Sequence, residues 1–255
     1  MRIALISDIH GNLAALEAVA ADIRRQGVDR VVNLGDNLSG PLLPRETASF
    51  LMASGWLSLA GNHDRQLLAM PNAAGTTPSD EYAHSQLTAV EFDWLRTLRP
   101  SVRLTDEVFL CHGTPANDCE YFLESVADGR VHLATAAEIA ARLGGEHSLL
   151  VACGHTHVPR AVRTADGQLM VNPGSVGLPA YSDDDPLPHV VETGSTDARY
   201  AIIERTPAGW NVQHIALPYD HTSMAALARL RNRPDWELAL MTGYAKQDRV
   251  TARLQ

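Results

Sequence analysis

Five short clusters of residues with metal-ligand side chains recur along this chain, and each follows directly on an apolar, strand-like run. The runs span residues 3–6, 31–34, 56–60, 108–110 and 149–152. The clusters that follow them are Asp8-Ile9-His10, Gly35-Asp36, Gly61-Asn62-His63-Asp64, Cys111-His112-Gly113 and Gly154-His155-Thr156-His157. In an open α/β sheet, functional residues collect beyond the carboxyl ends of the strands. The repeated arrangement therefore predicts that the five clusters meet at one edge and form the active site.

The first part of the chain alternates strand and helix patterns. Apolar residues at helical spacing predict a helix over 12–26 that ends at Gly27, followed by a Val-rich strand over 30–34. A helix over 45–53 and a strand over 56–60 repeat the pattern. This β-α-β-α-β order predicts parallel strands. Further helices are expected over 79–98 and 135–143, the first as packing or as a wall of the substrate cleft.

The pattern changes after residue 157. Runs at 160–164, 169–172, 200–204 and 210–217, joined by turns, predict strands of a second, more antiparallel sheet. We expect the two sheets to pack face to face with helices outside. The segment 181–197 is interpreted as a solvated loop, with a gate over the cleft as the alternative. Two helices of unknown role are expected over 222–231 and 234–241.

Length and composition allow one large domain or two small ones, since the chain has 255 residues and is 45% hydrophobic. We favour a single domain over 1–255, because a boundary between residues 8 and 157 would divide the ligand set. Within it we expect an inserted helical segment at about 65–100 and a C-terminal helical tail at about 218–255.

The formal charge of −9 argues against general binding of nucleic acid or an anionic membrane, because such binding requires clusters of Lys and Arg. Any phosphate would have to be held by metal. The chain enters a strand at once, without a signal-peptide pattern, and no apolar run approaches membrane-spanning length. We therefore expect a cytoplasmic protein.

The three cysteines, Cys111, Cys119 and Cys153, show no spacing typical of a disulfide framework or a structural zinc site. Cys111 and Cys153 end expected strands, so we interpret them as small core residues, with a softer metal ligand as the alternative.

The clusters supply carboxylate, imidazole and amide ligands that suit Mn, Fe, Zn or Mg. The candidate ligands are Asp8, His10, Asp36, Asn62, His112, His155 and His157. Seven ligands are too many for one tetrahedral zinc but suit two ions that share a carboxylate. The other histidines outside the clusters match no motif and are assigned no function.

Taken together, the five clusters resemble the signature of the calcineurin-like metallophosphoesterases over residues 3–177. The stretch Asn172-Pro173-Gly174-Ser175-Val176-Gly177 further resembles the small bacterial phosphodiesterase-like branch of that superfamily. The resemblance implies a metallo-dependent phosphatase fold, an α/β four-layer α-β-β-α sandwich of two mixed sheets flanked by helices.

The resemblance also implies how the candidate ligands divide between two divalent metal ions. Mn²⁺ is the first expectation, and Fe, Zn, Ni or Mg are alternatives. Asp36 would bridge the two ions. The first ion would take Asp8, His10 and His157, and the second would take Asn62, His112 and His155.

By the same resemblance, a hydroxide held between the ions would attack a phosphate ester in line. His63, beside Asn62, would be the general acid for the departing alkoxide, and Asp64 would fix its tautomer and orientation. The structural alternatives are a helix-start hydrogen bond for His63 and a helix N-cap for Asp64.

Three further polar residues lie beside the motifs. Asn12 is interpreted as the N-cap of the helix that follows. Arg65 and Arg160 could contact phosphate oxygens, but surface salt bridges are the simpler explanation.

The expected substrate is a small phosphodiester or phosphomonoester, nucleotide-like or otherwise. A dinucleotide polyphosphate hydrolase or a protein phosphatase is the alternative, although residues 37–41, Asn-Leu-Ser-Gly-Pro, replace the Val-Asp-Arg-Gly-type stretch of protein phosphatases. Three other hypotheses remain: a metal-binding platform for protein contacts, a single-metal hydrolase and a redox iron site. No tyrosine stands beside Asp36 to support the iron site. The oligomeric state, including a homodimer, stays open.

Overall fold

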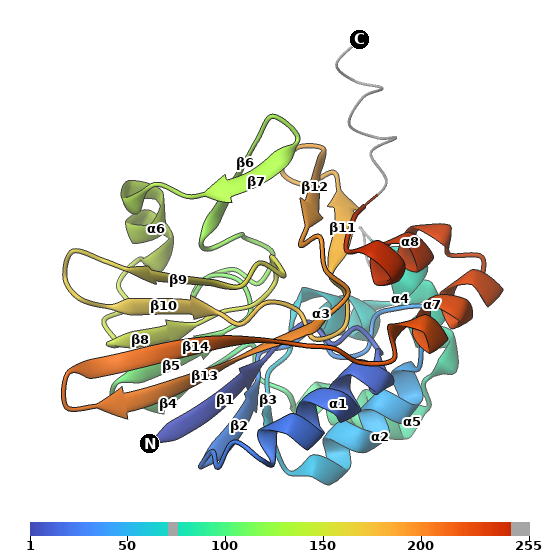
Figure 1. Cartoon of the computed structure of the whole chain (residues 1–255), viewed down its shortest axis with the longest axis horizontal. Coiled ribbons are helices and arrows are strands. Elements are labelled where there is room, and N and C mark those ends of the chain that lie inside the picture. Colours follow the sequence, from blue (N-terminus) through green and yellow to red (C-terminus); the bar gives the residue numbers. More distant parts are fainter. Residues whose placement is uncertain (71–75, 246–255) are drawn as a thin grey trace.

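The computed structural model describes residues 1–70 and 76–245 (Figure 1). Its helices are α1 (Leu13–Ile23), α2 (Pro44–Ser54), α3 (Asn62–Ala69), α4 (Pro78–Gln86), α5 (Ala89–Thr97), α6 (Ala136–Leu143), α7 (His221–Leu230) and α8 (Pro234–Thr242). Its strands are β1 (Arg2–Ile6), β2 (Arg30–Asn33), β3 (Leu57–Ser58), β4 (Ser101–Thr105), β5 (Val108–Cys111), β6 (Glu124–Ala127), β7 (Arg130–Leu133), β8 (Leu150–Ala152), β9 (Arg160–Arg163), β10 (Leu169–Asn172), β11 (Ala180–Asp183), β12 (His189–Glu192), β13 (Ala198–Thr206) and β14 (Gly209–Leu217).

The first sheet has the strand order β14-β13-β1-β2-β3. Its strands β1, β2 and β3 are parallel, as the alternating pattern predicted. The hairpin β13-β14 adds to this sheet with β13 antiparallel to β1, and this corrects the expectation that it belongs to the second sheet. The physical reason is burial, because Ile203 pairs with Ile3 and both side chains are fully buried.

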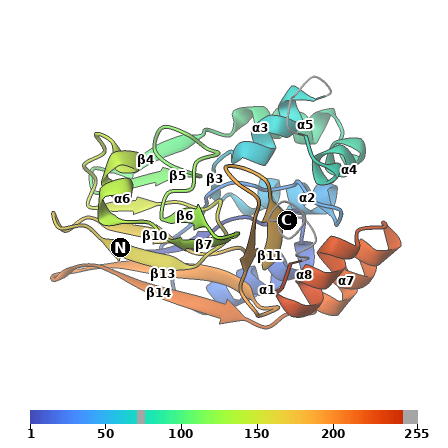
Figure 2. The ribbon, with the colours of Figure 1, turned by 90° about the horizontal axis from the view of Figure 1, so that it is seen from above.

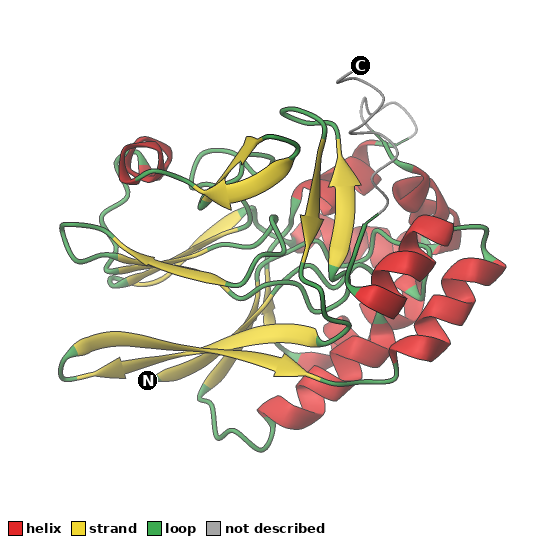
Figure 3. Cartoon of the chain, turned by 45° about the horizontal axis from the view of Figure 1, so that its top comes forward, coloured by secondary structure: helices red, strands yellow, loops and turns green. Residues whose placement is uncertain are grey.

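The second sheet has the order β4-β5-β8-β10-β9. It lies over the first sheet, and helices gather mainly at one end of the molecule (Figure 3). Side chains from both sheets form one buried cluster that includes Leu5, Val32, Leu110, Leu150 and Ile203. The fold is thus α/β with mixed sheets and flanking helices, and the apolar faces of the two sheets meet at this cluster.

A third sheet, with the order β11-β12-β7-β6, was not expected from the sequence. Its strands β11 and β12 occupy the front part of the segment 181–197, which was interpreted as a loop. That interpretation was wrong, because Val190 and Val191 are buried and β12 pairs with both β11 and β7. Figure 2 shows β11 between β7 and the C-terminal helices.

Two helical regions differ from the predictions among the described residues. Helix α3 was not predicted by its own bounds, only as part of the inserted segment at about 65–100. The helix expected over 79–98 is two helices, α4 and α5, which separate at Leu87 and Thr88. Thr88 is the N-cap of α5. Its hydroxyl accepts the backbone N–H of Val90, and the Glu91 carboxylate accepts the backbone N–H of Thr88. The expected C-terminal helices are confirmed as α7 and α8, and the rest of the expected tail, from residue 246, lies outside the described residues.

Helices α1 and α2 contribute to a buried cluster with strands of the first sheet, while α6 packs against the second sheet. Helices α7 and α8 share a cluster with β11 and with Leu42. Within 1–70 and 76–245, no helix is long and apolar enough to cross a bilayer.

Candidate metal centre

The ends of five strands from both large sheets meet at one place. Backbone hydrogen bonds join the segments that leave the strands: Asp8 N–H donates to Gly35 O at 3.0 Å, and Gly154 N–H donates to His112 O at 2.7 Å. Because β1, β2 and β3 lie in one sheet and β5 and β8 in the other, the single sheet edge predicted from the sequence is in fact a junction between two sheets.

The backbone at this junction is strained. Seven non-glycine residues in the described part of the chain have positive φ, and five of them are candidate ligands: Asp8, His10, Asp36, His155 and His157. Residues other than glycine rarely adopt this backbone conformation. It costs about 1–3 kcal/mol per residue and is found mostly at functional sites. The rest of the fold therefore holds these residues in place against a local penalty.

Two glycines allow the chain segments to come this close. A Cβ at Gly61 would lie 2.6 Å from the backbone nitrogen of Asp36 and would also overlap its carboxylate. A Cβ at Gly154 would overlap Ser7 and lie 3.0 Å from Oδ2 of Asp8. Any side chain at either position would displace a candidate ligand.

The first group of candidate ligands consists of Asp8, His10 and His157. Their ligand atoms lie within 4.8 Å of one another, and all three residues are buried. The two Nε2 atoms of His10 and His157 are 3.1 Å apart, and Oδ1 of Asp8 is 3.4 Å from Nε2 of His157. These distances suit three ligands that point at one ion.

The second group consists of Asp36, His112 and His155, which also present ligand atoms within 4.8 Å of one another. The amide oxygen of Asn62 joins them, since Oδ1 lies 3.1 Å from Nε2 of His112. Asn62, His112 and His155, which the resemblance assigns to one ion, are therefore close together in the structure.

Asp36 stands between the two groups. Its Oδ2 is 3.2 Å from Nε2 of His112 in the second group and 3.9 Å from Nε2 of His10 in the first. Its Oδ1 accepts the backbone N–H of His63 at 3.0 Å, which fixes the carboxylate. This is the position that a shared carboxylate ligand requires.

The hydrogen bonds of the imidazoles test whether a cation fits here. Nδ1 of His10, His112 and His157 lies 2.7, 2.9 and 2.8 Å from the carbonyl oxygens of Ser39, Leu34 and Leu178. A carbonyl oxygen only accepts, so each Nδ1 carries the hydrogen and Nε2 is free to act as a ligand. In His155 the two nitrogens exchange roles: Nε2 lies 3.0 Å from the carbonyl oxygen of Cys119 and carries the hydrogen, so Nδ1 is free to act as a ligand. The donor set therefore fits metal binding.

The charges at the centre support the same conclusion. Burial and the neighbouring His157 lower the pKa of His10 to about 4, and burial and His112 lower the pKa of His155 to about 4. Both rings are thus neutral at pH 7, as metal binding requires. Burial opposes charge on His112, but Asp36 outweighs it and raises the pKa of His112 to about 10. A cation in this position would replace that proton.

His63 lies beside the two groups, and its carboxylate partner differs from the expected one. Its Nδ1 lies 2.9 Å from Oδ1 of Asp80, a fully buried residue on α4. Thr77 donates to the other Asp80 oxygen from its backbone N–H and its hydroxyl, both at 2.8 Å. Burial disfavours charge on His63, but Asp36 and Asp80 outweigh it and raise the pKa of His63 to about 9.

The role expected of Asp64, fixing the tautomer of His63, is corrected by these contacts. The Asp64 carboxylate accepts the backbone N–H groups of Asp36, Asn37 and Gly61 at 3.0, 3.1 and 2.9 Å. Asp64 is the third residue of α3, and its side chain points back at the start of the helix and at the loop after β2. Burial and Asp36 raise the pKa of Asp64 to about 7. Asp64 thus holds the backbone around Asp36.

A cavity of about 760 Å³ opens onto both groups of candidate ligands. Its walls come from the loops after β2 and β3, the start of α4, β11 and the turn between α7 and α8. No role was expected for the C-terminal tail, and Asp80, Tyr181, Arg233 and Trp236 match none of the motifs. Thr77-x-x-Asp80 is a capping-box pattern, but no local signal connects it to His63.

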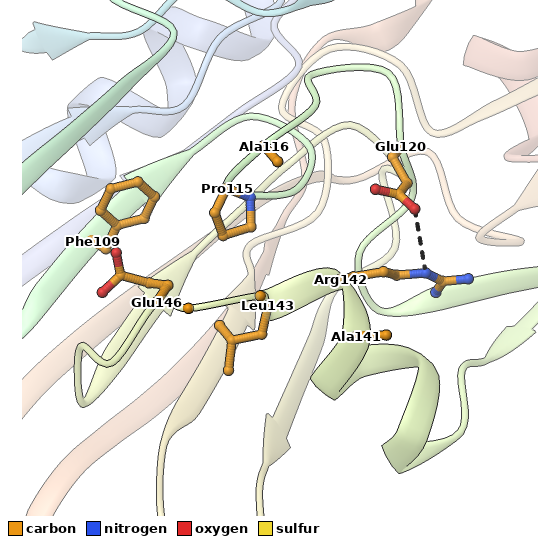
Figure 4. A pocket seen from close by; sticks show the side chains of 10 residues that line it. Phe109, Pro115, Ala116, Glu120, Ala141, Arg142, Leu143 and Glu146 are labelled. Atoms are coloured by element: carbon orange, nitrogen blue, oxygen red, sulfur yellow. Dashed lines mark ion pairs between the residues drawn. The ribbon is translucent and has the colours of Figure 1, made fainter.

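A separate hollow of about 460 Å³ lies beside α6 and is drawn in Figure 4. Phe109, Pro115 and Leu143 line it, and Glu120 faces Arg142 at 4.0 Å across one end. It shares no lining residue with the cavity at the candidate ligands, so the chemistry belongs to the larger cavity.

The polar residues beside the motifs make structural contacts. Arg65 pairs with Asp118 at 2.7 Å in the surface salt bridge that was expected. Arg160 is also in a salt bridge, but its partner at 2.6 Å, Glu124, is fully buried, so the expectation of a surface pair was wrong there. Asn12 caps α1 by accepting from the N–H of Ala15. Cys111 and Cys153 are buried.

Two adjoining Asp/His groups at strand ends, within mixed sheets flanked by helices, define the class of metallophosphoesterases. The family described as the calcineurin-like phosphoesterase superfamily domain matches residues 1–194, and this chain belongs to that superfamily.

Individual relatives resemble the chain over nearly its whole length. A metallophosphoesterase from Sphaerobacter thermophilus has a similar crystal structure, with a TM-score of 0.74 and 26% identity over 95% of this chain and 99% of that one. A hypothetical protein from Pyrococcus horikoshii OT3 shares the fold, with a TM-score of 0.74 and 20% identity over 96% and 99% of the two chains. An uncharacterized protein of Methanocaldococcus jannaschii is 24% identical over 92% of this chain and 94% of its own.

Proposed function

We propose that this protein hydrolyses a small phosphate ester with two divalent metal ions. The observation that carries the proposal is the position of Asp36, whose Oδ2 lies near His112 of its own group and near His10 of the other group of candidate ligands. Membership in the calcineurin-like phosphoesterase superfamily supports it. Mn²⁺ is the ion we favour, because carboxylate, imidazole and amide ligands together suit it.

In this proposal Asp8, His10 and His157 would hold one ion, Asn62, His112 and His155 would hold the other, and Asp36 would contribute to both. Two cations held there would neutralise the charge of a phosphate ester and activate water for attack. The carbonyl oxygens that accept from the Nδ1 atoms keep the imidazoles oriented. No covalent attachment of the phosphoryl group to a side chain is required.

We assign His63 as the group that gives a proton to the departing alcohol. It lines the cavity beside Asn62, and its ion pair with the buried Asp80 favours the protonated imidazole. Asp80 accepts from Nδ1, so Nε2 is the nitrogen that is free to donate. The hydrogen bonds from Thr77 to Asp80 hold this pair in position.

The substrate class is a phosphodiester or phosphomonoester with a small organic group. The cavity of about 760 Å³ holds a ligand of nucleotide size. The loop over 37–41 lacks the stretch typical of protein phosphatases, which favours a small molecule over a phosphoprotein.

The test uses metal-stripped protein refilled with manganese and assayed on paired chromogenic monoesters and diesters. We expect wild-type protein to bind two ions per chain and to hydrolyse the esters. We expect Asp36→Asn to lose both metal binding and turnover. Arg24→Ala is the control for the handling of the protein, because Arg24 is an exposed residue at the C-terminal end of α1. Turnover by Asp36→Asn at the wild-type rate would overturn the assignment, and full metal loading without turnover of any ester would favour the binding-platform alternative.

A further inference from the structure

The turn between α7 and α8 forms part of the cavity wall, although it lies beyond residues 1–194 that match the superfamily. Asn232, Arg233, Asp235 and Trp236 line the cavity. The ring of Trp236 packs against the ring of His10, with centroids 6.1 Å apart. A part of the chain outside the family match thus reaches a candidate ligand.

The turn is docked firmly on α4. Arg231 stacks over the ring of Tyr82 at 4.6 Å and donates to the carbonyl oxygens of Pro41 and Leu42. Behind it, α7 and α8 pack in a buried apolar cluster with β11. The position of Arg233 is therefore set by packed structure, as a selective binding group requires.

Arg233 is the one Arg or Lys among the described residues that line this cavity. Its Nε and Nη2 donate to the two oxygens of Asp235 at 3.0 and 2.7 Å, and its Nη1 donates to Oγ of Ser79 at 2.9 Å. A guanidinium has five N–H groups. These three bonds orient it and leave two N–H groups for a ligand.

The wall also shows which part of a substrate Arg233 would meet. Ser79 precedes Asp80 on α4, and Asp80 holds His63. The guanidinium is thus anchored, through Ser79, to the turn of α4 that also carries the partner of His63. Because His63 protonates the departing alcohol in the proposed function, we place Arg233 on the leaving-group side of the ester.

Other cations near the site are occupied elsewhere. Arg65 and Arg160 are held by Asp118 and Glu124, and neither lines the cavity. The Asp235 carboxylate, which could repel an anion, is itself engaged by Arg233. An anion on the leaving group thus has one fixed partner in this wall.

We propose that Arg233 determines substrate specificity by binding an anionic oxygen group, a carboxylate or a second phosphate, on the leaving alcohol of the ester. This inference rests on the proposed function for the orientation of the substrate. It adds a substrate class: phosphate esters of alcohols that carry their own negative charge.

The test measures binding, so it does not depend on turnover. Manganese-loaded protein is titrated by calorimetry with glycerol 3-phosphate, whose alcohol is neutral, and with 3-phosphoglycerate, whose alcohol carries a carboxylate. Glycerol 1,3-bisphosphate is the third probe and carries a second phosphate. We expect one of the charged esters to bind about 10-fold more tightly than the neutral ester, as a charge-assisted pair predicts. The tighter of the two identifies the anion.

Variants assign the preference to Arg233. Arg233→Ala should remove the preference, and Arg233→Lys should keep only part of it, because Lys lacks the planar fork. Ser79→Ala, which removes one anchor and keeps the guanidinium, should weaken it less. Arg229→Ala is the matched control, since Arg229 lies on the same tail, is exposed and pairs with Glu237.

Three outcomes would overturn the inference: equal binding of the neutral and charged esters, no binding of any of them, or an equal loss of preference in Arg229→Ala and Arg233→Ala. A preference that depends on Arg233 in a protein that hydrolyses no ester would support the binding site and refute the proposed function. The chromogenic assay described above separates these two cases.

Discussion

Nδ1 of His63 lies 2.9 Å from Oδ1 of Asp80, a residue 17 positions further along the chain and on another helix. The contact joins the start of α3, which follows a candidate ligand, to the start of α4. It gives Asp80 a role in positioning His63, and it separates that role from the one played by Asp64.

Replacing Asp80 with Ala should lower kcat by about 10- to 100-fold, because His63 loses the partner that orients its ring and keeps it protonated. The loss should be greatest for esters with poor leaving groups, such as phenyl, and smallest for p-nitrophenyl, which departs without a proton. The measurement is kcat against leaving-group pKa for the manganese-loaded variant.

Three companion variants complete this experiment. His63→Ala should keep metal binding, lower the rate by about 100-fold, and make a further change at Asp80 nearly silent. Asp80→Asn should recover part of the rate, and exposed Asp93→Ala should match wild type. An equal loss for every leaving group in Asp80→Ala would show that Asp80 supports only the fold.

Replacing Asp64 with Ala should lower the free energy of unfolding by about 3 kcal/mol, because three buried backbone N–H groups would lose their acceptor. The measurement is urea unfolding of metal-free protein, with Asp93→Ala as the control, which we expect to change stability by less than about 0.5 kcal/mol. Wild-type stability in Asp64→Ala, together with lost turnover, would return Asp64 to a chemical role.

Replacing Gly61 with Ala should prevent metal loading, because the new Cβ would overlap the Asp36 carboxylate and its backbone nitrogen. Metal content after dialysis against manganese is the measurement. Gly145→Ala is the control, since a Cβ there meets nothing within 4 Å. Two ions bound to Gly61→Ala would show that the loop after β3 can move away from Asp36 at little cost.

The capping box of α6 should make stability depend on pH. The Thr135 hydroxyl and backbone N–H, with help from Ser125, lower the pKa of Glu138 from 4.5 to about 2. A carboxylate with a lowered folded-state pKa stabilises the protein above its unfolded pKa, and the contribution is lost as pH falls from 4.5 towards 2.

Glu138→Gln should therefore unfold at lower urea than wild type at pH 7, and the two midpoints should approach each other below pH 4.5. Because the Glu138 side chain is partly exposed to solvent, the difference should be small and should shrink in high salt. An equal difference between the two urea midpoints at pH 7 and at pH 3 would mean that the charge on Glu138 contributes nothing to stability.

The parallel strands and most helices were predictable because their signals are local. Residues 13–23 carry an apolar stripe at helical spacing and form α1. Asn12 caps this helix by accepting the backbone N–H of Ala15, three residues further along. Sheet membership was not predictable in this way. The strand β13 looks like its hairpin partner β14, and only burial of Ile203 against the first sheet decides where the pair goes.

Two other errors have the same origin. The acidic run Asp183-Asp184-Asp185 is typical of a loop, yet residues 180–183 pair with β12, whose Val190 and Val191 are buried. The helix expected over 79–98 has a continuous apolar pattern, but the capping interactions of Thr88 start a new helix within it. Pairing with distant segments and competition between caps are not visible in periodicity alone.

The sequence by itself determined the candidate ligand set, because five clusters of carboxylate, imidazole and amide side chains recur directly after strands, and strand direction carries them to a common end. Tertiary structure alone decided which carboxylate meets His63 and which segment closes the cavity. Asp80 lies in α4 and Arg233 directly precedes α8, where the local signals describe only helix formation. Their positions follow from the docking of α4 against the α7–α8 turn, which depends on packing between residues far apart in the chain.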